Sequence, residues 1–148
     1  MKKIILLTTF IWIGFVSSIS FMESWLKFQA PNITTKLGLG IGKLVFNALN
    51  TVEITFAIII SICLISALVK GLKQQTPYLF FIIILVLTVQ TFWLLPALVE
   101  RADLIINDVQ VPKSNLHLAF GLLEILKIAS LFVFGLNQMQ KDKIPNLN

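Results

Sequence analysis

The chain has 148 residues, of which 57% are hydrophobic and only 13% are charged. That charged share is about half of what soluble domains carry, so the composition excludes an ordinary soluble fold. The net charge is +5, but the basic residues stand at the ends of apolar segments rather than on one face, which argues against nucleic acid as a partner. The composition predicts an integral membrane protein surrounded by the lipid bilayer.

The first predicted span covers about residues 4–22, an uncharged run that follows the basic start Met1-Lys2-Lys3. A helix needs about 20 apolar residues to cross the hydrocarbon core, and this run is long enough. A basic start followed by an apolar run and the small residues at 17–20 also fits a cleaved secretory signal. The run exceeds the about 7–15 residues of a signal core, so a retained helix is preferred.

The second predicted span covers about residues 44–69 and is closed by Lys70 and Lys73. A helix over residues 37–69 would be roughly 50 Å long, more than a perpendicular crossing requires. We therefore expect this helix to tilt, to kink or to begin outside the lipid.

The third and fourth predicted spans cover about residues 78–98 and 115–136. A polar hinge between them contains the interfacial residues Glu100, Arg101 and Asp103. No internal repeat or low-complexity linker divides the chain. Residues 1–148 are thus predicted to form one domain, an all-α four-helix transmembrane bundle.

The basic residues also predict an orientation. An even number of spans places both termini on the same side of the membrane as the short loop at Lys70 and Lys73. Because short basic loops with few acids stay in the cytoplasm, this favours cytoplasmic N- and C-termini. The expected location is a bacterial cytoplasmic membrane.

Ionisable residues inside the spans are the candidates for function, because the membrane interior makes them expensive to keep. Glu124 lies near mid-bilayer, where insertion scales put an unpaired charge at roughly 2.5–3.5 kcal/mol. It should therefore be paired or protonated. Lys127 follows three residues later, and His117 precedes Glu124 by seven residues on nearly the same face.

His117, Glu124 and Lys127 form a polar stripe on the fourth span, and the second span carries an equivalent stripe of Lys43, Asn47, Asn50 and Glu53. We expect the two stripes to face each other, with Glu53 and Lys127 as partners. Glu124 and Lys127 could instead neutralise each other within one helix, while the Asn residues form hydrogen bonds that hold the helices together. Both interpretations stay open. The predicted intramembrane polar cluster consists of Asn47, Asn50, Glu53, Gln90, His117, Glu124 and Lys127.

Three segments resemble a known family: Gly14-Phe15-Val16 continuing to Phe21, Ala30-Pro31, and Gly38-Leu39-Gly40-Ile41-Gly42-Lys43-Leu44-Val45-Phe46. They are similar to the first half of an uncharacterised four-span membrane family, the bacterial domain of unknown function related to the eukaryotic transmembrane protein associated with cisplatin resistance. His117 matches a His at the head of that family's last span, although the usual following Arg is absent. The resemblance implies a four-helix membrane bundle and no established activity.

Two alternatives of other classes remain. Asn50-Thr51-Val52-Glu53 is similar to the Asn-x-x-Glu segment of the membrane-associated eicosanoid and glutathione metabolism family. Those enzymes carry an Arg three residues before that Asn, where this chain has Asn47. The other alternative is a small proton-coupled exporter that works as a dimer and uses Glu53 or Glu124.

The sequence predicts a non-catalytic protein more strongly than an enzyme. With one His and one Cys, the chain cannot build a bis-His haem site or a His/Cys metal site by itself. We therefore expect no metal, no cofactor and no catalytic residue. The expected role is a small polytopic protein that binds or passes a small solute through a polar interior or supports a membrane partner, with a homo-oligomer as a further option.

Overall fold

The computed structural model describes residues 1–71 and 77–140, which form helices and no strand. Lys73, which closes the second predicted span and entered the predicted topology, lies outside the described residues. Four helices within these ranges are long and apolar enough to cross a membrane: Lys2–Gln29, Thr35–Val69, Pro77–Ile106 and Leu116–Met139. The fold is therefore an all-α four-helix bundle, and its four apolar helices fit an integral membrane protein.

Two of the four helices are interrupted by short irregular turns. The first runs from α1 (Lys2–Val16) through the π-helical turn η1 (Ser17–Glu23) into α2 (Ser24–Leu26) and the 3-10 turn η2 (Lys27–Gln29). The third consists of α4 (Pro77–Val89), the π-helical turn η3 (Gln90–Leu94) and α5 (Leu95–Ile106). The second and fourth are the single helices α3 (Thr35–Val69) and α6 (Leu116–Gln140).

The turn η3 has an identifiable cause in the sequence. Pro96 follows it, and a proline ring inside a helix clashes with the carbonyl four residues earlier, here that of Phe92. The wider π-helical turn contains Phe92 and absorbs this clash, so the helix continues to Ile106. The same turn begins at Gln90 and helps to set the direction in which that side chain points.

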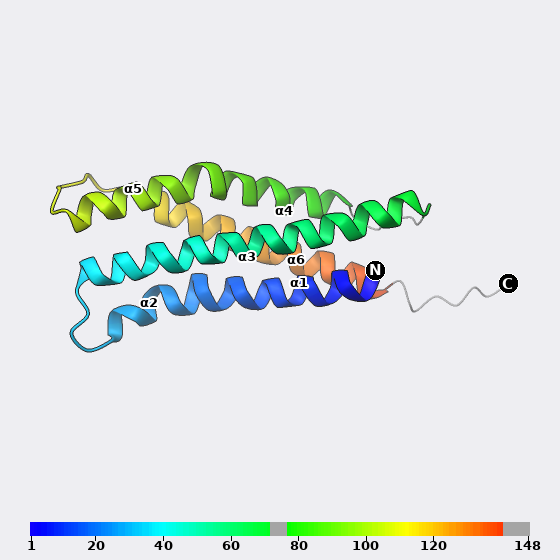
Figure 1. Ribbon diagram of the computed structural model, residues 1–148, viewed down its shortest axis with the longest axis horizontal. Helices are drawn as coiled ribbons and strands as arrows, with labels where there is room; N and C mark the ends of the chain where they lie inside the picture. Colours follow the sequence, from blue (N-terminus) through cyan, green and yellow to red (C-terminus); the bar gives the residue numbers. More distant parts are fainter. Residues whose placement is uncertain (72–76, 141–148) are drawn as a thin grey trace.

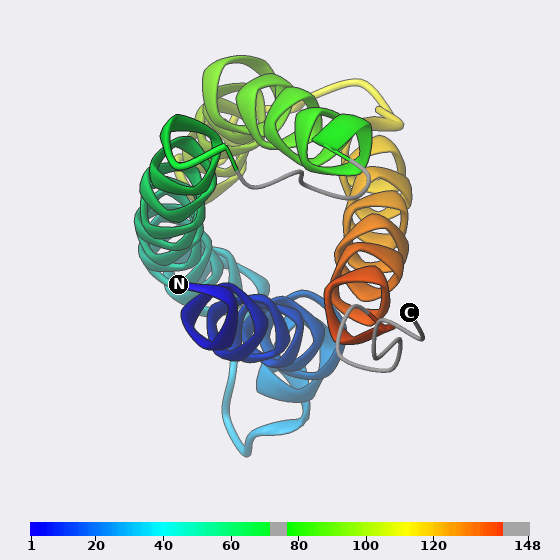
Figure 2. The ribbon, with the colours of Figure 1, turned by 90° about the vertical axis from the view of Figure 1, so that its right-hand side faces the viewer.

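Figure 2 shows the four helices arranged around a central axis, with α1 between α3 and α6 and with α4 on the opposite side. Both described chain ends lie at the same end of the bundle, opposite the connections that follow η2 and α5 (Figure 1). The connection before α3 is fixed by Thr34, whose Oγ1 accepts a hydrogen bond from the Leu37 amide at 3.2 Å. This side-chain cap satisfies one of the free amides at the helix start.

The bundle is apolar both inside and outside. Trp12, Ile60, Ile83, Leu131 and Phe134 are fully buried and form the centre of the core. Large apolar side chains also cover the outer surface, as a membrane environment requires: among them are Val69, Phe92, Leu44 and Leu7. Lipid chains, rather than water, are the solvent that suits this surface.

The predicted polar hinge is wrong in one respect, because Glu100, Arg101 and Asp103 belong to α5 and not to a loop. The helix persists beyond the apolar run since its polar residues find partners at the end of the bundle. Asp103 forms an ion pair with Lys43 of α3, and Arg101 donates to the carbonyl of Pro112. Glu100 is exposed.

Candidate functional site

Five buried polar side chains meet in the middle of the bundle, and we call them the central network: Trp12, Glu53, Gln90, Glu124 and Lys127. They come from all four long helices, and none is more than 3% exposed. Each lies well inside its helix rather than at an end. The network therefore sits at the depth where the membrane interior is least tolerant of charge.

Lys127 is the centre of this network. Its Nζ lies 2.5 Å from Glu53 Oε1, 2.7 Å from Gln90 Oε1 and 3.1 Å from Glu124 Oε1. The ammonium donates hydrogen bonds to Gln90 and Glu124 and forms an ion pair with Glu53. The predicted pairing of Glu53 with Lys127 across facing helices is confirmed, and the intrahelical pair of Glu124 with Lys127 is present as well.

The two carboxylates have different surroundings. Glu53 Oε1 accepts a hydrogen bond from the Trp12 indole N–H at 2.9 Å in addition to the contact with Lys127. Glu124 Oε1 accepts from Gln90 Nε2 at 2.9 Å and from Lys127. The other oxygen, Glu124 Oε2, is buried and has no hydrogen-bond partner among the described residues.

Three predicted cluster residues lie outside the central network. Asn50 accepts a hydrogen bond from Thr91 at 2.8 Å and joins α3 to η3 beside the network. Asn47 is exposed and donates to the carbonyl of Lys43 on its own helix. At about 100° per residue, Asn47 projects about 120° away from Glu53, which explains its separation. His117 shares the face of Glu124 but lies about 10 Å along the axis, two turns away.

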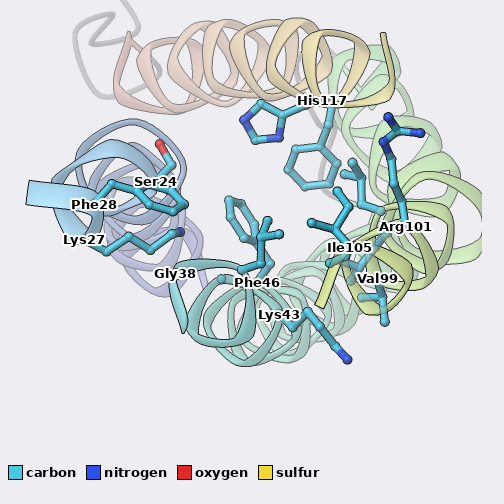
Figure 3. A pocket seen from close by; sticks show the side chains of 16 residues that line it. Ser24, Lys27, Phe28, Gly38, Lys43, Phe46, Val99, Arg101, Ile105 and His117 are labelled. Carbon is cyan, nitrogen blue, oxygen red and sulfur yellow. The ribbon is translucent and has the colours of Figure 1, made fainter. Parts of the chain in front are cut away.

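His117 instead lines a pocket near the end of the bundle away from the chain termini, which we call the end pocket (Figure 3). Its volume is about 310 Å³, and α2, η2, α3, α5 and α6 surround it. Most of its lining is apolar, including Phe28, Leu98 and Ile105. Its ionisable lining residues are Lys27, Lys43, Arg101 and His117, and no Asp or Glu belongs to the lining.

Lys27 is the cation best placed to act in this pocket. Figure 3 shows its nitrogen pointing into the space between the helices, as the His117 ring does, while Lys43 points away. The Lys27 side chain is only 9% exposed, and its Nζ lies 3.1 Å from Glu23 Oε2. The ammonium also lies 5.6 Å from the centre of the Phe46 ring. Its position depends on Gly42, where a Cβ would approach Nζ to 3.2 Å.

A pair of aromatic rings separates the end pocket from the central network. Phe46 of α3 and Phe120 of α6 pack edge to face with ring centres 5.5 Å apart. Both rings line the pocket. Phe120 precedes Glu124 by one helical turn, or about 6 Å along the axis. The pocket thus ends one turn away from the buried carboxyl group.

Two important residues were not among the predicted site residues. Trp12 looks like one more apolar residue of the first span, but tryptophans concentrate at membrane interfaces, and one deep in a span needs a partner for its N–H. Lys27 looks like a loop residue. Its role depends on the way α2 and η2 extend the first helix over the start of α3, which no local pattern indicates.

No family model, curated protein or solved structure matches this chain. Within residues 1–71 and 77–140, no group of three His, Cys, Asp or Glu side chains is placed to hold a metal ion. The candidate site therefore has two parts. One is a buried polar network in the middle of the bundle, and the other is an apolar pocket with basic lining residues near one end of the bundle.

Proposed function

We propose that this protein binds a small amphiphile with an apolar body and an anionic head group in the end pocket. The observation that carries this proposal is the ammonium of Lys27, which points with the His117 ring into an apolar pocket whose lining contains no Asp or Glu. A volume of about 310 Å³ is at the lower end of the range of about 300–1,000 Å³ found for ligand pockets. A short single-chain fatty acid or alkyl phosphate has this combination of size and charge.

The state of Lys27 supports the choice of an anion. Among the described residues, Glu23 is its only hydrogen-bond partner. An ammonium has three N–H donors, so two are left for a ligand. A carboxylate or phosphate oxygen would accept them in surroundings that contain little water, where charge-assisted hydrogen bonds are strong. The apolar wall of the pocket suits a ligand that partitions into lipid.

Binding is better supported than passage through the bundle. A solute moving along the axis would have to separate the Phe46 and Phe120 rings and then disrupt the central network, whose members are 0–3% exposed. His117, the residue that the resemblance to the uncharacterised four-span family singles out, is part of the pocket lining. We propose that the chain is related to that family, on the strength of the segments that resemble it and of His117.

Photolabelling of the protein in lipid nanodiscs tests the function. A decanoate that carries a diazirine on its chain should label residues of the pocket lining, and unlabelled decanoate should compete whereas decanol should compete at least tenfold less well. Glutathione, the ligand required by the alternative enzyme hypothesis, should not compete. Labelling spread evenly over the lipid-facing surface would contradict the proposal.

Two matched pairs of variants sharpen this experiment. Lys27→Met should reduce labelling at least fivefold because the head group loses its ion partner, whereas Lys36→Met, at an exposed ion pair on the same end of the bundle, should not. Ala102→Phe should block the pocket since Ala102 is a buried lining residue. Ala97→Phe on the same helix serves as its control. Equal labelling in all four variants would overturn the assignment of the pocket.

We also propose that both termini are cytoplasmic in a bacterial cytoplasmic membrane, which turns the end pocket toward the outer side. In a Cys63→Ser background, cysteines placed at Lys70 and at Gln110 should react with a membrane-impermeant maleimide from opposite sides. Gln110 should be labelled in intact spheroplasts and Lys70 only after the membrane is opened. Labelling of both from one side would refute a four-span topology, and exchange of the two results would invert it.

A further inference from the structure

The central network contains one acid more than it has bases. Glu53 and Glu124 face a single ammonium, that of Lys127, from α3 and α6. The other elements packed against them contribute the neutral groups Trp12 of α1 and Gln90 of η3. If all three ionisable groups were charged, the network would carry a net charge of −1 in the middle of the membrane.

The hydrogen bonds distinguish the two carboxyl groups. Lysine can only donate, so Gln90 must turn its oxygen to Lys127 and its NH₂ group to Glu124, as the structure has it. Glu124 Oε1 then accepts two hydrogen bonds, as a carbonyl oxygen does, while Glu124 Oε2 is buried without any donor near it. An ionised oxygen in that position would be costly, whereas a neutral hydroxyl would be much less so.

We propose that Glu124 is a proton-binding site, which holds one proton on Oε2 at neutral pH while Glu53 and Lys127 form an ion pair. The network is then electrically neutral as a whole. The short contact of 2.5 Å between Lys127 Nζ and Glu53 Oε1, against 3.1 Å to Glu124 Oε1, matches this distribution of charge. The inference is independent of what the end pocket binds.

In a proton-binding network the number of bound protons follows the balance of the charged groups, which would not hold for a merely structural network. Removing the acid of Glu53 leaves Glu124 alone with Lys127, so Glu124 should give up its proton. Removing the base of Lys127 leaves two acids without a cation, so a second proton should bind. Each variant changes one group and predicts a different proton count.

Infrared spectroscopy of the protein in nanodiscs at pH 7 measures this count directly, through the carbonyl stretch of protonated carboxylic acids and its shift in D₂O. The wild type should show one such signal, Glu124→Gln and Glu53→Gln none, and Lys127→Met about twice the wild-type signal. Asp108→Asn, which changes an exposed carboxylate on the loop, should leave the signal unchanged. Circular dichroism checks that each variant is folded.

The outcomes separate cleanly. Absence of the signal in the wild type, or its persistence in Glu124→Gln, would overturn the assignment of the proton to Glu124. Persistence in Glu53→Gln would show that charge balance does not control it and would also overturn the proposal. Should Lys127→Met fail to fold, the two glutamine variants decide the question by themselves, because each replaces one carboxyl group with an amide of nearly the same shape.

The same measurement tests the route of the proton. Glu124 lies one turn from the Phe120 ring at the inner end of the end pocket, so exchange with D₂O should be slow in the wild type and at least tenfold faster in Phe120→Ala. Phe134→Ala also removes a buried ring from α6, but it lies on the other side of the network and is the matched control. Equal acceleration in both variants would exclude a route through the end pocket.

Discussion

Replacement of Lys127 by methionine is expected to lower the free energy of unfolding by about 3–5 kcal/mol, because Glu53 loses its cation and must either stay charged in the core or take up a proton at a cost. The methionine keeps most of the apolar stem, so the loss reports on the ammonium. Unfolding by SDS in mixed micelles measures it. The loss should shrink in acidic buffer, where protonation of Glu53, the carboxylate left without its cation, costs less.

Combination with Glu53→Gln tests whether the loss arises in the central network. In a double-mutant cycle, the double variant should be more stable than the sum of the single losses predicts, with a coupling of about 0.5–3 kcal/mol, because it no longer contains an unbalanced carboxylate. Lys36→Met, which breaks an exposed ion pair with Asp108, should have little effect. Strict additivity would show that Glu53 and Lys127 do not stabilise each other.

Replacement of Trp12 by alanine is expected to cost about 3–5 kcal/mol, as for other large aromatic residues removed from a tightly packed core. Trp12 is 0% exposed, packs against Phe56 and donates its N–H to Glu53. Trp12→Phe keeps most of the ring but leaves Glu53 with one donor fewer, so it should lose about 1–3 kcal/mol. The same SDS titration measures both variants.

Trp93→Ala is the control for this experiment. Trp93 is 64% exposed on the outer surface, where lipid chains fill the space that a smaller side chain leaves. We expect almost no change in stability. If Trp93→Ala lowered the free energy of unfolding as much as Trp12→Ala does, the size of the residue alone would explain both losses. The burial of Trp12 and its hydrogen bond to Glu53 would then contribute nothing.

The sequence by itself determined the class of the protein and the number of its long helices. Spans of about 20 apolar residues are set by the thickness of the bilayer, so they can be found without any knowledge of neighbours. The sequence also led to the contact between Glu53 and Lys127, because charge inside a membrane needs a partner and few candidates exist. Hydropathy placed the helix ends less well, since ion pairs such as that between Lys43 and Asp103 extend α3 and α5 beyond the apolar runs.

Apart from the contact between Glu53 and Lys127, only the tertiary structure decided which side chains meet. A membrane helix is apolar on all sides, so its sequence does not reveal which face is turned inward, and Trp12 could not be told from its lipid-facing neighbours. The π-helical turn η3 changes the rotation of the third helix just where Gln90 enters the network. The end pocket depends on the packing of Lys27 over Gly42, a contact between helices that no spacing along the chain encodes.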